Sequence, residues 1–376
     1  MFTKKNVFVF FCFFTFIFII IFLIKYNNNL DNNKNPINNK KNVILGYIYN
    51  YSWETMRNYF ISLLKADIKN TDIVMFVKHI PEETLEKIKS FGVITYPIPD
   101  NSPYPPNTQR YVLYGKFLSE NKDKYNMALH ADVRDTIFQK DVFEVYKDYK
   151  SFLALSIEDL FLTDEANRNW LLEICNETIF NKYLSDKHAI CAGLILGSVD
   201  KFIELTDEIL KRAEKRRNAI EQAVINYMIY YEKVFSDCII MKTNKDGNIL
   251  TIGAVDRNKI NLDNENNILN FENKVAGAVH QYDRLEDIKQ KMNQKFDDSN
   301  FNYTYFKEER EKINIKKYNK NYFSTITISI ISIIIVIIFI SFLVKIILQK
   351  SKNEFEKVKI LKKIKKNKKR YVYIKI

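Results

Sequence analysis

Short apolar runs alternate with stretches of helical period through the central part of the chain. The uninterrupted runs are typical of buried strands; they are residues 42–49, 71–77, 91–96, 127–129, 152–155, 188–198 and 274–279. The stretches with apolar residues three and four positions apart predict amphipathic helices; they are residues 53–65, 81–90, 109–120, 167–181, 199–216 and 218–231. Alternating strands and helices predict an α/β domain with a mostly parallel sheet and right-handed crossovers.

Turn signals separate several of these elements. Residues 97–106 contain five prolines and are expected to form a loop. Residues 238–241 and 249–252 have the composition of two further short strands. Because Asp246-Gly247 between them is a hairpin turn signal, we expect these two strands to pair with each other.

Two long apolar runs flank this central region. Residues 7–24 are 18 uncharged residues rich in Phe and Ile, and residues 321–344 are 24 uncharged residues rich in Ile. Both are long enough to span a bilayer, the first only just. The alternative for 7–24 is a cleaved signal peptide, but small residues before a cleavage point are missing, which favours an uncleaved anchor.

These runs predict seven segments. They are a cytosolic tail (1–6), a transmembrane helix (7–24), an Asn- and Lys-rich stem (25–41), a folded domain (42–300), a second stem (301–322), a second transmembrane helix (323–348) and a basic cytosolic tail (349–376).

The net charge of +13 is concentrated at one end of the chain. Residues 349–376 hold 12 basic and two acidic residues, which leaves the central domain nearly neutral and argues against a nucleic-acid surface on it. Lys and Arg favour the cytosolic side of membrane spans, so both termini are expected in the cytosol and residues 25–320 in the Golgi or ER lumen. Sequons at Asn50, Asn176 and Asn302 agree with a lumenal domain.

Cysteine is scarce in the expected lumenal region. Only Cys175, Cys191 and Cys238 fall there, so one disulfide is possible but a disulfide framework is not expected.

The apolar run 127–129 leads directly into a cluster of polar residues. Asp132 and Asp135 follow it, with Arg134 between them. Ligands of open α/β sheets collect at the carboxyl ends of strands. Two carboxylates there suit a hard divalent cation that also holds phosphate oxygens. The alternative is a strand-end turn whose acids are solvated and cap a helix.

Four motifs occur in an order that is more specific than any one of them. They are Asp-Val-Arg-Asp followed by Phe-Gln, then Ala-Gly-Leu-Ile-Leu-Gly-Ser, an acid-Gln pair, and a late His-Gln-Tyr-Asp-Arg. This order resembles GT-A-fold glycosyltransferase-like proteins over residues 42–295. The resemblance implies a single GT-A-like (Rossmann-like) α/β domain with a mostly parallel sheet flanked by helices, here between two transmembrane helices. The acids are two apart in the commonest family pattern, whereas here they are three apart.

The resemblance implies a metal site and a donor site. Asp132, Asp135 and His280 would bind Mn²⁺ or Mg²⁺, although a lone His at a strand end is often structural. Arg134 would contact the donor diphosphate or a neighbouring acid. Gly193 would let the backbone approach the donor closely, or it marks a strand bulge.

Further positions are implied on the same grounds. Arg110 would contact the donor, or it is a surface residue. Tyr47 and Tyr49 would stack on the nucleotide base, or they are core residues. Glu221 and Gln222 match an acid-Gln pair beside the transferred sugar and are the catalytic candidates. Asn218-Ala-Ile-Glu221 also fits a helix capping box, which needs no catalysis.

The sequence therefore favours a membrane-anchored, metal-dependent glycosyltransferase. It would move a sugar from a UDP- or GDP-linked donor to a glycan, glycoprotein or glycolipid acceptor. Two alternatives stay open. One is a catalytically silent membrane scaffold with the same fold, and the other is a nucleotide-sugar hydrolase that uses the same site.

Overall fold

The computed structural model describes residues 40–214, 220–299, 334 and 337–362. The chain divides into two units, Met1–Thr304 and Tyr305–Ile376, which are described separately here. The predicted tail 1–6, transmembrane helix 7–24 and second stem 301–322 lie outside the described residues, as do the sequon at Asn302 and nearly all of the first stem.

The first unit is built on a seven-stranded sheet. In spatial order its strands are β3 (Ile94–Pro97), β2 (Thr71–Lys78), β1 (Lys41–Tyr49), β4 (Tyr125–Ala131), β7 (His188–Ser198), β6 (Leu153–Phe161) and β8 (Ile239–Lys242). Neighbours from β3 to β4 are parallel, as are β6 and β8, whereas β7 is antiparallel to both β4 and β6. The expected α/β domain with a mostly parallel sheet is confirmed.

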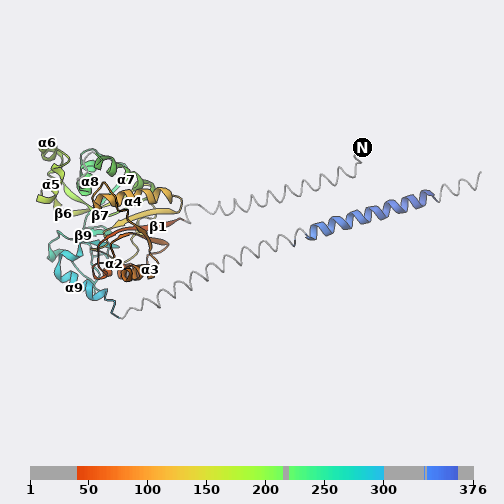
Figure 1. Ribbon diagram of the computed structural model, residues 1–376, viewed down its shortest axis with the longest axis horizontal. Helices are drawn as coiled ribbons and strands as arrows, with labels where there is room; N and C mark the ends of the chain where they lie inside the picture. Colours follow the sequence, from red (N-terminus) through yellow and green to blue (C-terminus); the bar gives the residue numbers. More distant parts are fainter. Residues whose placement is uncertain (1–39, 215–219, 300–333, 335–336, 363–376) are drawn as a thin grey trace, which may run out of the picture. The chain divides into compact units, whose positions relative to one another are not determined.

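Helices cover both faces of this sheet (Figure 1). On one side lie α2 (Trp53–Lys65) and α3 (Glu82–Ser90), and on the other α4 (Pro106–Glu120), α7 (Val199–Ala213) and α8 (Glu221–Tyr230). Helix α4 begins with a proline in its first turn, where the missing N–H costs no hydrogen bond. The start at Pro106, three residues before the predicted start, places Arg110 one turn inside the helix.

A second sheet of three short strands carries the late part of the domain. Its order is β5 (Thr136–Phe138), β10 (Ala278–His280) and β9 (Ile249–Thr251). β5 was not predicted, whereas the predicted runs 249–252 and 274–279 contain β9 and part of β10. β5 begins one residue after Asp135 and pairs antiparallel with β10, so that His280 lies opposite Thr136. This pairing joins two segments about 140 residues apart in the sequence.

The predicted hairpin of residues 238–241 and 249–252 is wrong. A turn does form, since the N–H of Gly247 donates to the carbonyl of Thr243 at 3.0 Å. However, β8 pairs with β6 in the large sheet, whereas β9 pairs with β10 in the small one. The turn therefore joins two sheets instead of two strands of one hairpin.

The single helix predicted over residues 167–181 is divided. It consists of α5 (Glu165–Leu172), α6 (Glu177–Ile179) and a π-helical turn, Phe180–Leu184. The side chains of Asp164 and Asn176 each accept a backbone N–H at the start of α5 and α6, at 3.2 and 2.9 Å. Two separate N-caps therefore start two separate helices.

The remaining elements are short helices. They are the 3₁₀ turns Glu144–Tyr146, Arg257–Lys259 and Tyr282–Arg284, and the helix α9 (Glu286–Lys295). No helix was predicted over the residues of α9. Among the described residues, Cys175, Cys191 and Cys238 are buried thiols and form no disulfide with one another.

An ionic cluster lies at the edge of the large sheet where β1, β2 and β4 begin. The carboxylate of Asp72 accepts from Lys41 at 2.6 Å, from Lys124 at 2.8 Å and from the hydroxyl of Tyr125 at 2.9 Å. Burial opposes charge on Asp72, but these partners outweigh it and lower the pKa of its carboxyl. The cluster holds the starts of these three strands together at the edge opposite the site.

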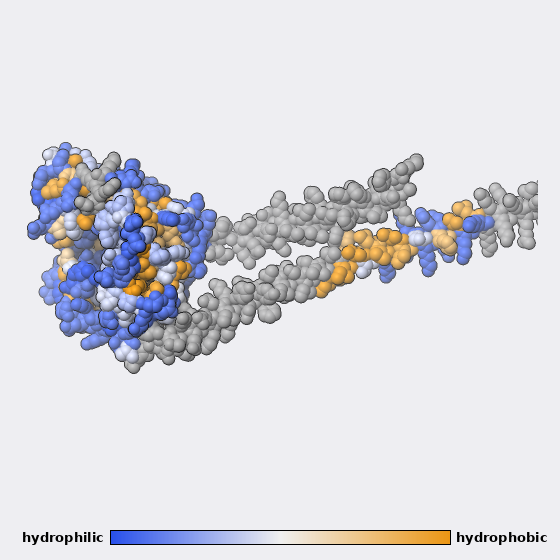
Figure 2. Space-filling view, viewed as in Figure 1, coloured by the Kyte–Doolittle hydropathy of each residue, from blue (hydrophilic) through white to orange (hydrophobic). Residues whose placement is uncertain are grey.

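In the second unit, residues 337–362 form a helix. Its first part is hydrophobic and its second part is mainly hydrophilic (Figure 2). Within the stretches that the structure describes, no helix is both long enough and apolar enough to cross a membrane. The predicted transmembrane segment 323–348 is described only at residue 334 and from 337 on, and the helix continues past 348 into the predicted tail.

Candidate active site

The first acid of the site is held where the large sheet reverses direction. Asp132 follows β4 directly, and its N–H donates to the carbonyl of Gly193 in β7 at 2.8 Å. Because β7 is antiparallel to β4, the segment from His188 to Gly193 runs on past the carboxyl end of β4. The Asp132 carboxylate is therefore presented at the carboxyl edge of the sheet, as the sequence predicted.

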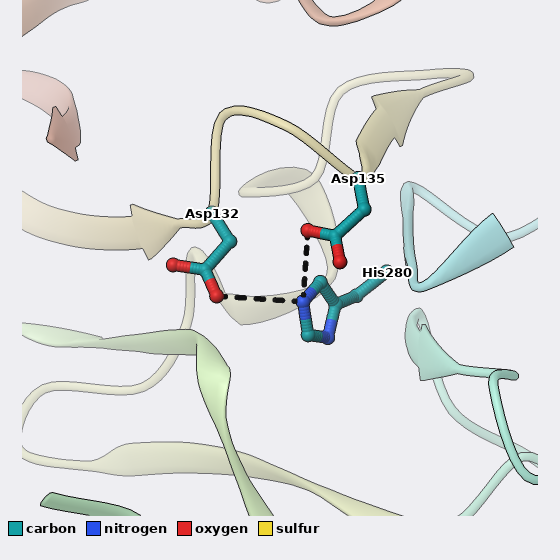
Figure 3. A group of neighbouring side chains, drawn as sticks. All are labelled: Asp132, Asp135 and His280. Carbon is teal, nitrogen blue, oxygen red and sulfur yellow. Dashed lines mark ion pairs between the residues drawn. The ribbon is translucent and has the colours of Figure 1, made fainter. Parts of the chain in front are cut away.

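The small sheet brings the second acid and the histidine to the same place. Asp135 precedes β5, and its carbonyl accepts the N–H of Gln281 at 2.8 Å, directly after His280 in β10. The Nε2 atom of His280 lies 3.3 Å from Oδ1 of Asp135 and 3.6 Å from Oδ2 of Asp132 (Figure 3). One ligand atom from each of the three residues lies within 4.8 Å of the others. The predicted triad is brought together.

Two polar atoms of this triad have no hydrogen-bond partner. Oδ1 of Asp135 and Nε2 of His280 are buried and unpartnered, although they lie close together. Two buried lone-pair donors that point at a common position leave it suited to a cation. The residues therefore fit a divalent metal ion.

Gly193 makes room for this arrangement. A Cβ atom at this position would lie 2.4 Å from Cε1 and 2.5 Å from Nε2 of His280, and 2.6 Å from Oδ2 of Asp132. Any side chain on Gly193 would collide with two of the three residues. The glycine is required here because the imidazole packs directly onto the strand.

Arg110 lies between two acids of the site. Its guanidinium donates to Oδ1 of Asp132 and, at 2.7 Å, to Oε1 of Glu221, and the residue is only 7% exposed. The alternative of a surface arginine is therefore wrong. Burial disfavours charge on Arg110, but Asp132 and Glu221 outweigh it and hold its pKa well above the ordinary value.

Two further arginines contact the second acid. Arg134 and Arg284 donate to Oδ2 of Asp135 at 2.8 and 3.2 Å. Of the two partners that the sequence left open for Arg134, the structure shows the neighbouring acid. Arg284 belongs to the His-Gln-Tyr-Asp-Arg motif, but the sequence analysis gave it no role. Burial raises the pKa of Asp135, and His280 and Arg134 reverse this so that the pKa is lowered.

A pocket of about 290 Å³ opens beside the acids. It is lined by Tyr47, Tyr49, Tyr51, Pro106, Asn107, Arg110, Asp132, Val133, Arg134 and Asp135. Both predicted tyrosines line it, and Tyr51, which the sequence analysis did not name, is a third. The hydroxyl of Tyr47 donates to Oε1 of Gln109 at 2.9 Å, which fixes that ring, and burial raises the pKa of Tyr47 to about 12.

The two catalytic candidates, Glu221 and Gln222, begin helix α8. Glu221 is buried and paired to Arg110, and burial raises the pKa of its carboxyl. Gln222 accepts the N–H of Ala192 at 3.2 Å and donates to Asn167 at 3.0 Å. Neither residue is among those that line the pocket. Asn218 of the expected capping box lies outside the described residues, and Ile220 occupies the N-cap position of α8.

His130 supports the site from within the core, and the sequence analysis gave it no role. Its ring is fully buried against Tyr111 and Tyr114, and its Nε2 lies 3.5 Å from Oδ1 of Asp132. Burial, together with nearby Arg110, lowers the pKa of His130 to about 4. The ring is therefore neutral at pH 7 and fills the space beneath Asp132 without adding charge.

No family model matches the chain, and no curated protein matches it. Among solved structures, it is similar to the galactosyltransferase LgtC in complex with donor and acceptor sugar analogues, with a TM-score of 0.41 and 11% identity over 68% of this chain and 95% of that one. It is also similar to an active-site mutant of LgtC, with a TM-score of 0.41 and 10% identity over 71% of this chain and 94% of that one. Because these TM-scores lie below 0.5, we base the functional proposal on the residues of the site.

Proposed function

We propose that this protein is a metal-dependent, GT-A-like glycosyltransferase that takes a nucleotide-diphosphate sugar as donor. The main observation behind the proposal is that Asp132, Asp135 and His280 lie close together beside a pocket lined by tyrosines. Two carboxylates and one imidazole, with buried unpartnered atoms, are a ligand set for Mn²⁺ or Mg²⁺. When bound, the ion would offset the charge of the donor diphosphate.

The charges around the site support a cation and a phosphate group together. Four carboxylates and three guanidinium groups form two sets of ion pairs, and His280 lies between the two sets. One set is Asp132 and Glu221 with Arg110, and the other is Asp135 and Asp283 with Arg134 and Arg284. With a neutral His280, the two sets together have one negative charge in excess, which favours cation binding. The arginines lie where they can donate to phosphate oxygens, and guanidinium suits phosphate better than ammonium does.

The pocket side of the site suits a nucleotide. Tyr47, Tyr49 and Tyr51 line the pocket together with Arg110 and Arg134, so aromatic and cationic groups share one space. An aromatic ring gives a base a face to stack on without reading its identity. The base would therefore lie over the tyrosines, with the diphosphate directed toward the acids.

The pairing of Glu221 favours a supporting role for this residue. Its Oε1 atom accepts from Arg110, which in turn donates to Asp132. Glu221 would hold Arg110 in the orientation that both the metal ligand and the diphosphate need. The proton of the acceptor hydroxyl would then be taken by another group, because Glu221 does not reach the pocket.

The location of the domain remains part of the proposal. The apolar run 7–24 and the basic tail support membrane anchoring, with the domain in the lumen of the secretory pathway and both termini in the cytosol. Acceptors of that compartment are glycans, glycoproteins and glycolipids.

A thermal-shift experiment on the full-length chain tests the function. UDP and GDP are each added with Mn²⁺ or with EDTA. A nucleotide at about 100 times its Kd stabilises the fold by roughly 2.7 kcal/mol. We expect one nucleotide to raise Tm, only with Mn²⁺, and Asp135→Asn and His280→Ala to remove the effect. Glu144→Gln is the matched control, because Glu144 is an exposed acid paired to Lys147. A folded chain that responds to neither nucleotide would support the silent scaffold instead.

A further inference from the structure

The two ring nitrogens of His280 face different partners. Nε2 faces Asp132 and Asp135, at 3.6 and 3.3 Å. Nδ1 faces the opposite way and lies 3.2 Å from the Sγ atom of Cys191. Both residues are almost completely buried, with His280 3% and Cys191 1% exposed. The contact between imidazole and thiol is therefore shielded from water.

Metal binding through Nε2 would determine which nitrogen of His280 carries the proton. A neutral imidazole that binds a cation through Nε2 has its hydrogen on Nδ1. That hydrogen needs an acceptor, and at this position the acceptor is the sulfur of Cys191. The same sulfur lies 3.4 Å from the backbone N–H of Gly193, which also donates to it. Two donors thus converge on one sulfur atom.

A buried carboxylate completes the chain of contacts. Glu158 lies in β6 beside β7, where the register between the two strands is irregular. It is 5% exposed, and its Oε1 atom has no hydrogen-bond partner. Burial raises the pKa of its carboxyl, and the nearby His280 and Cys191 oppose that rise. The thiol hydrogen can point to Glu158 while the sulfur accepts from His280. Donation from His280 to Cys191 and from Cys191 to Glu158 would give each of these buried groups a partner.

We propose that Cys191 and Glu158 are positioning residues, which fix the orientation of the His280 ring and keep its proton on Nδ1. The proposal rests on the proposed function, since His280 matters only if it binds a metal ion. Groups that orient metal-binding histidines in this way typically change metal affinity by 10- to 100-fold when removed. Neither residue touches the pocket, so neither is catalytic.

A packing role and a hydrogen-bonding role for Cys191 predict different effects of substitution. If Cys191 only filled space, alanine would cost some stability and serine would bring no benefit. If its sulfur must accept from Nδ1, serine restores the function because its hydroxyl accepts and donates in the same way. For Glu158, glutamine keeps an acceptor oxygen, whereas methionine has a similar length and lacks it.

The first measurement is NMR of the histidine ring nitrogens in the full-length chain. The sequence has four histidines, His79, His130, His188 and His280, so the signals can be assigned one substitution at a time. We expect a slowly exchanging Nδ1–H resonance for His280 in the wild type, with and without Mg²⁺. A neutral ring that binds a metal ion through Nε2 and a doubly protonated ring both carry a hydrogen on Nδ1.

The variants then separate the two explanations. Cys191→Ala and Glu158→Met should lose the resonance, and Cys191→Ser and Glu158→Gln should keep it. Cys238→Ala is the matched control, because Cys238 is also a buried thiol but donates to the carbonyl of Phe235. If Cys191→Ala keeps the resonance as the control does, the proposal is overturned.

The second measurement is the Kd for Mn²⁺ alone. We expect Cys191→Ala to bind Mn²⁺ about 10- to 100-fold more weakly than the wild type, with Cys191→Ser close to the wild type. If the Kd for Mn²⁺ is unchanged in Cys191→Ala but higher in His280→Ala, the positioning role is overturned and the metal site is supported. The wild type could fail to bind Mn²⁺ while Cys191→Ala still lacks the resonance that the wild type shows. That result would refute the metal-dependent function but would support the contact between Cys191 and His280.

Discussion

Gly193 offers the sharpest test of the site, because one methyl group should disturb the histidine and an acid together. In Gly193→Ala the new Cβ would lie 2.4–2.5 Å from two ring atoms of His280 and 2.6 Å from Asp132. Real Cβ contacts are about 1 Å longer, so the ring must move. The ring is only 3% exposed and packs against Cys191, so it has little space to move into.

The expected magnitude follows from this crowding. Inserting a methyl group into a packed core typically costs about 1–3 kcal/mol. For a domain of this size that corresponds to roughly 2–4 °C of Tm per kcal/mol. The displaced ring should also weaken Mn²⁺ binding by about 10-fold or more, because metal ligands tolerate little error in position.

Gly197→Ala is the matched control in the same strand. Its Cβ would lie 2.7 Å from Cδ2 of Leu153 and 2.8 Å from the carbonyl of Phe152, so it should cost similar stability. It touches none of the three candidate ligands. Thermal unfolding and Mn²⁺ titration of both variants form the assay. If Gly193→Ala unfolds like Gly197→Ala and binds Mn²⁺ as tightly, the imidazole is not a ligand and the reasoning fails.

Three other substitutions test separate parts of the structure. Arg110→Met should destabilise the fold by about 3–5 kcal/mol in urea unfolding, because Asp132 and Glu221 lose a shared buried partner; adding Glu221→Gln should recover part of the loss. Tyr47→Ala should raise the nucleotide Kd by roughly 5- to 150-fold in calorimetry, and Tyr47→Phe should change it little, since the ring supplies the stacking. Asp72→Asn should lower Tm at pH 7. Its folded-state pKa is lowered, so the wild-type advantage should disappear as the pH falls below the ordinary value of 3.8; a Tm difference independent of pH would contradict the ionic explanation.

Much of the large sheet could be predicted, because its strands are long enough to leave a pattern. The helix over 53–65 and the strand over 188–198 have the predicted bounds. In the small sheet, the predicted runs 249–252 and 274–279 contain β9 and part of β10, whereas β5 and the pairing of these three strands were not predicted. Their pairing depends on contacts between distant segments, and a local turn signal at Asp246-Gly247 pointed to the wrong partner.

Some residues of the candidate site could be predicted from the sequence and others could not. The position after a buried strand and the order of the motifs singled out Asp132, Asp135 and His280, which the structure places together. These criteria gave no role to His130 or Glu158, because a polar residue inside an apolar strand has no distinctive neighbours in the sequence. What makes those two relevant is burial and distance, and neither is visible before the chain is folded.

The unusual spacing of the two acids has a structural explanation. Asp132 is fixed to the large sheet through the carbonyl of Gly193, and Asp135 is fixed to the small sheet through the N–H of Gln281. The residues between them form a turn in which Val133 is 2% exposed. Each acid is therefore positioned by its own sheet, and the turn only has to span the distance between two fixed points. A spacing of three can then serve as well as a spacing of two, because the position of the carboxylates is set by strand pairing and not by the number of residues between them.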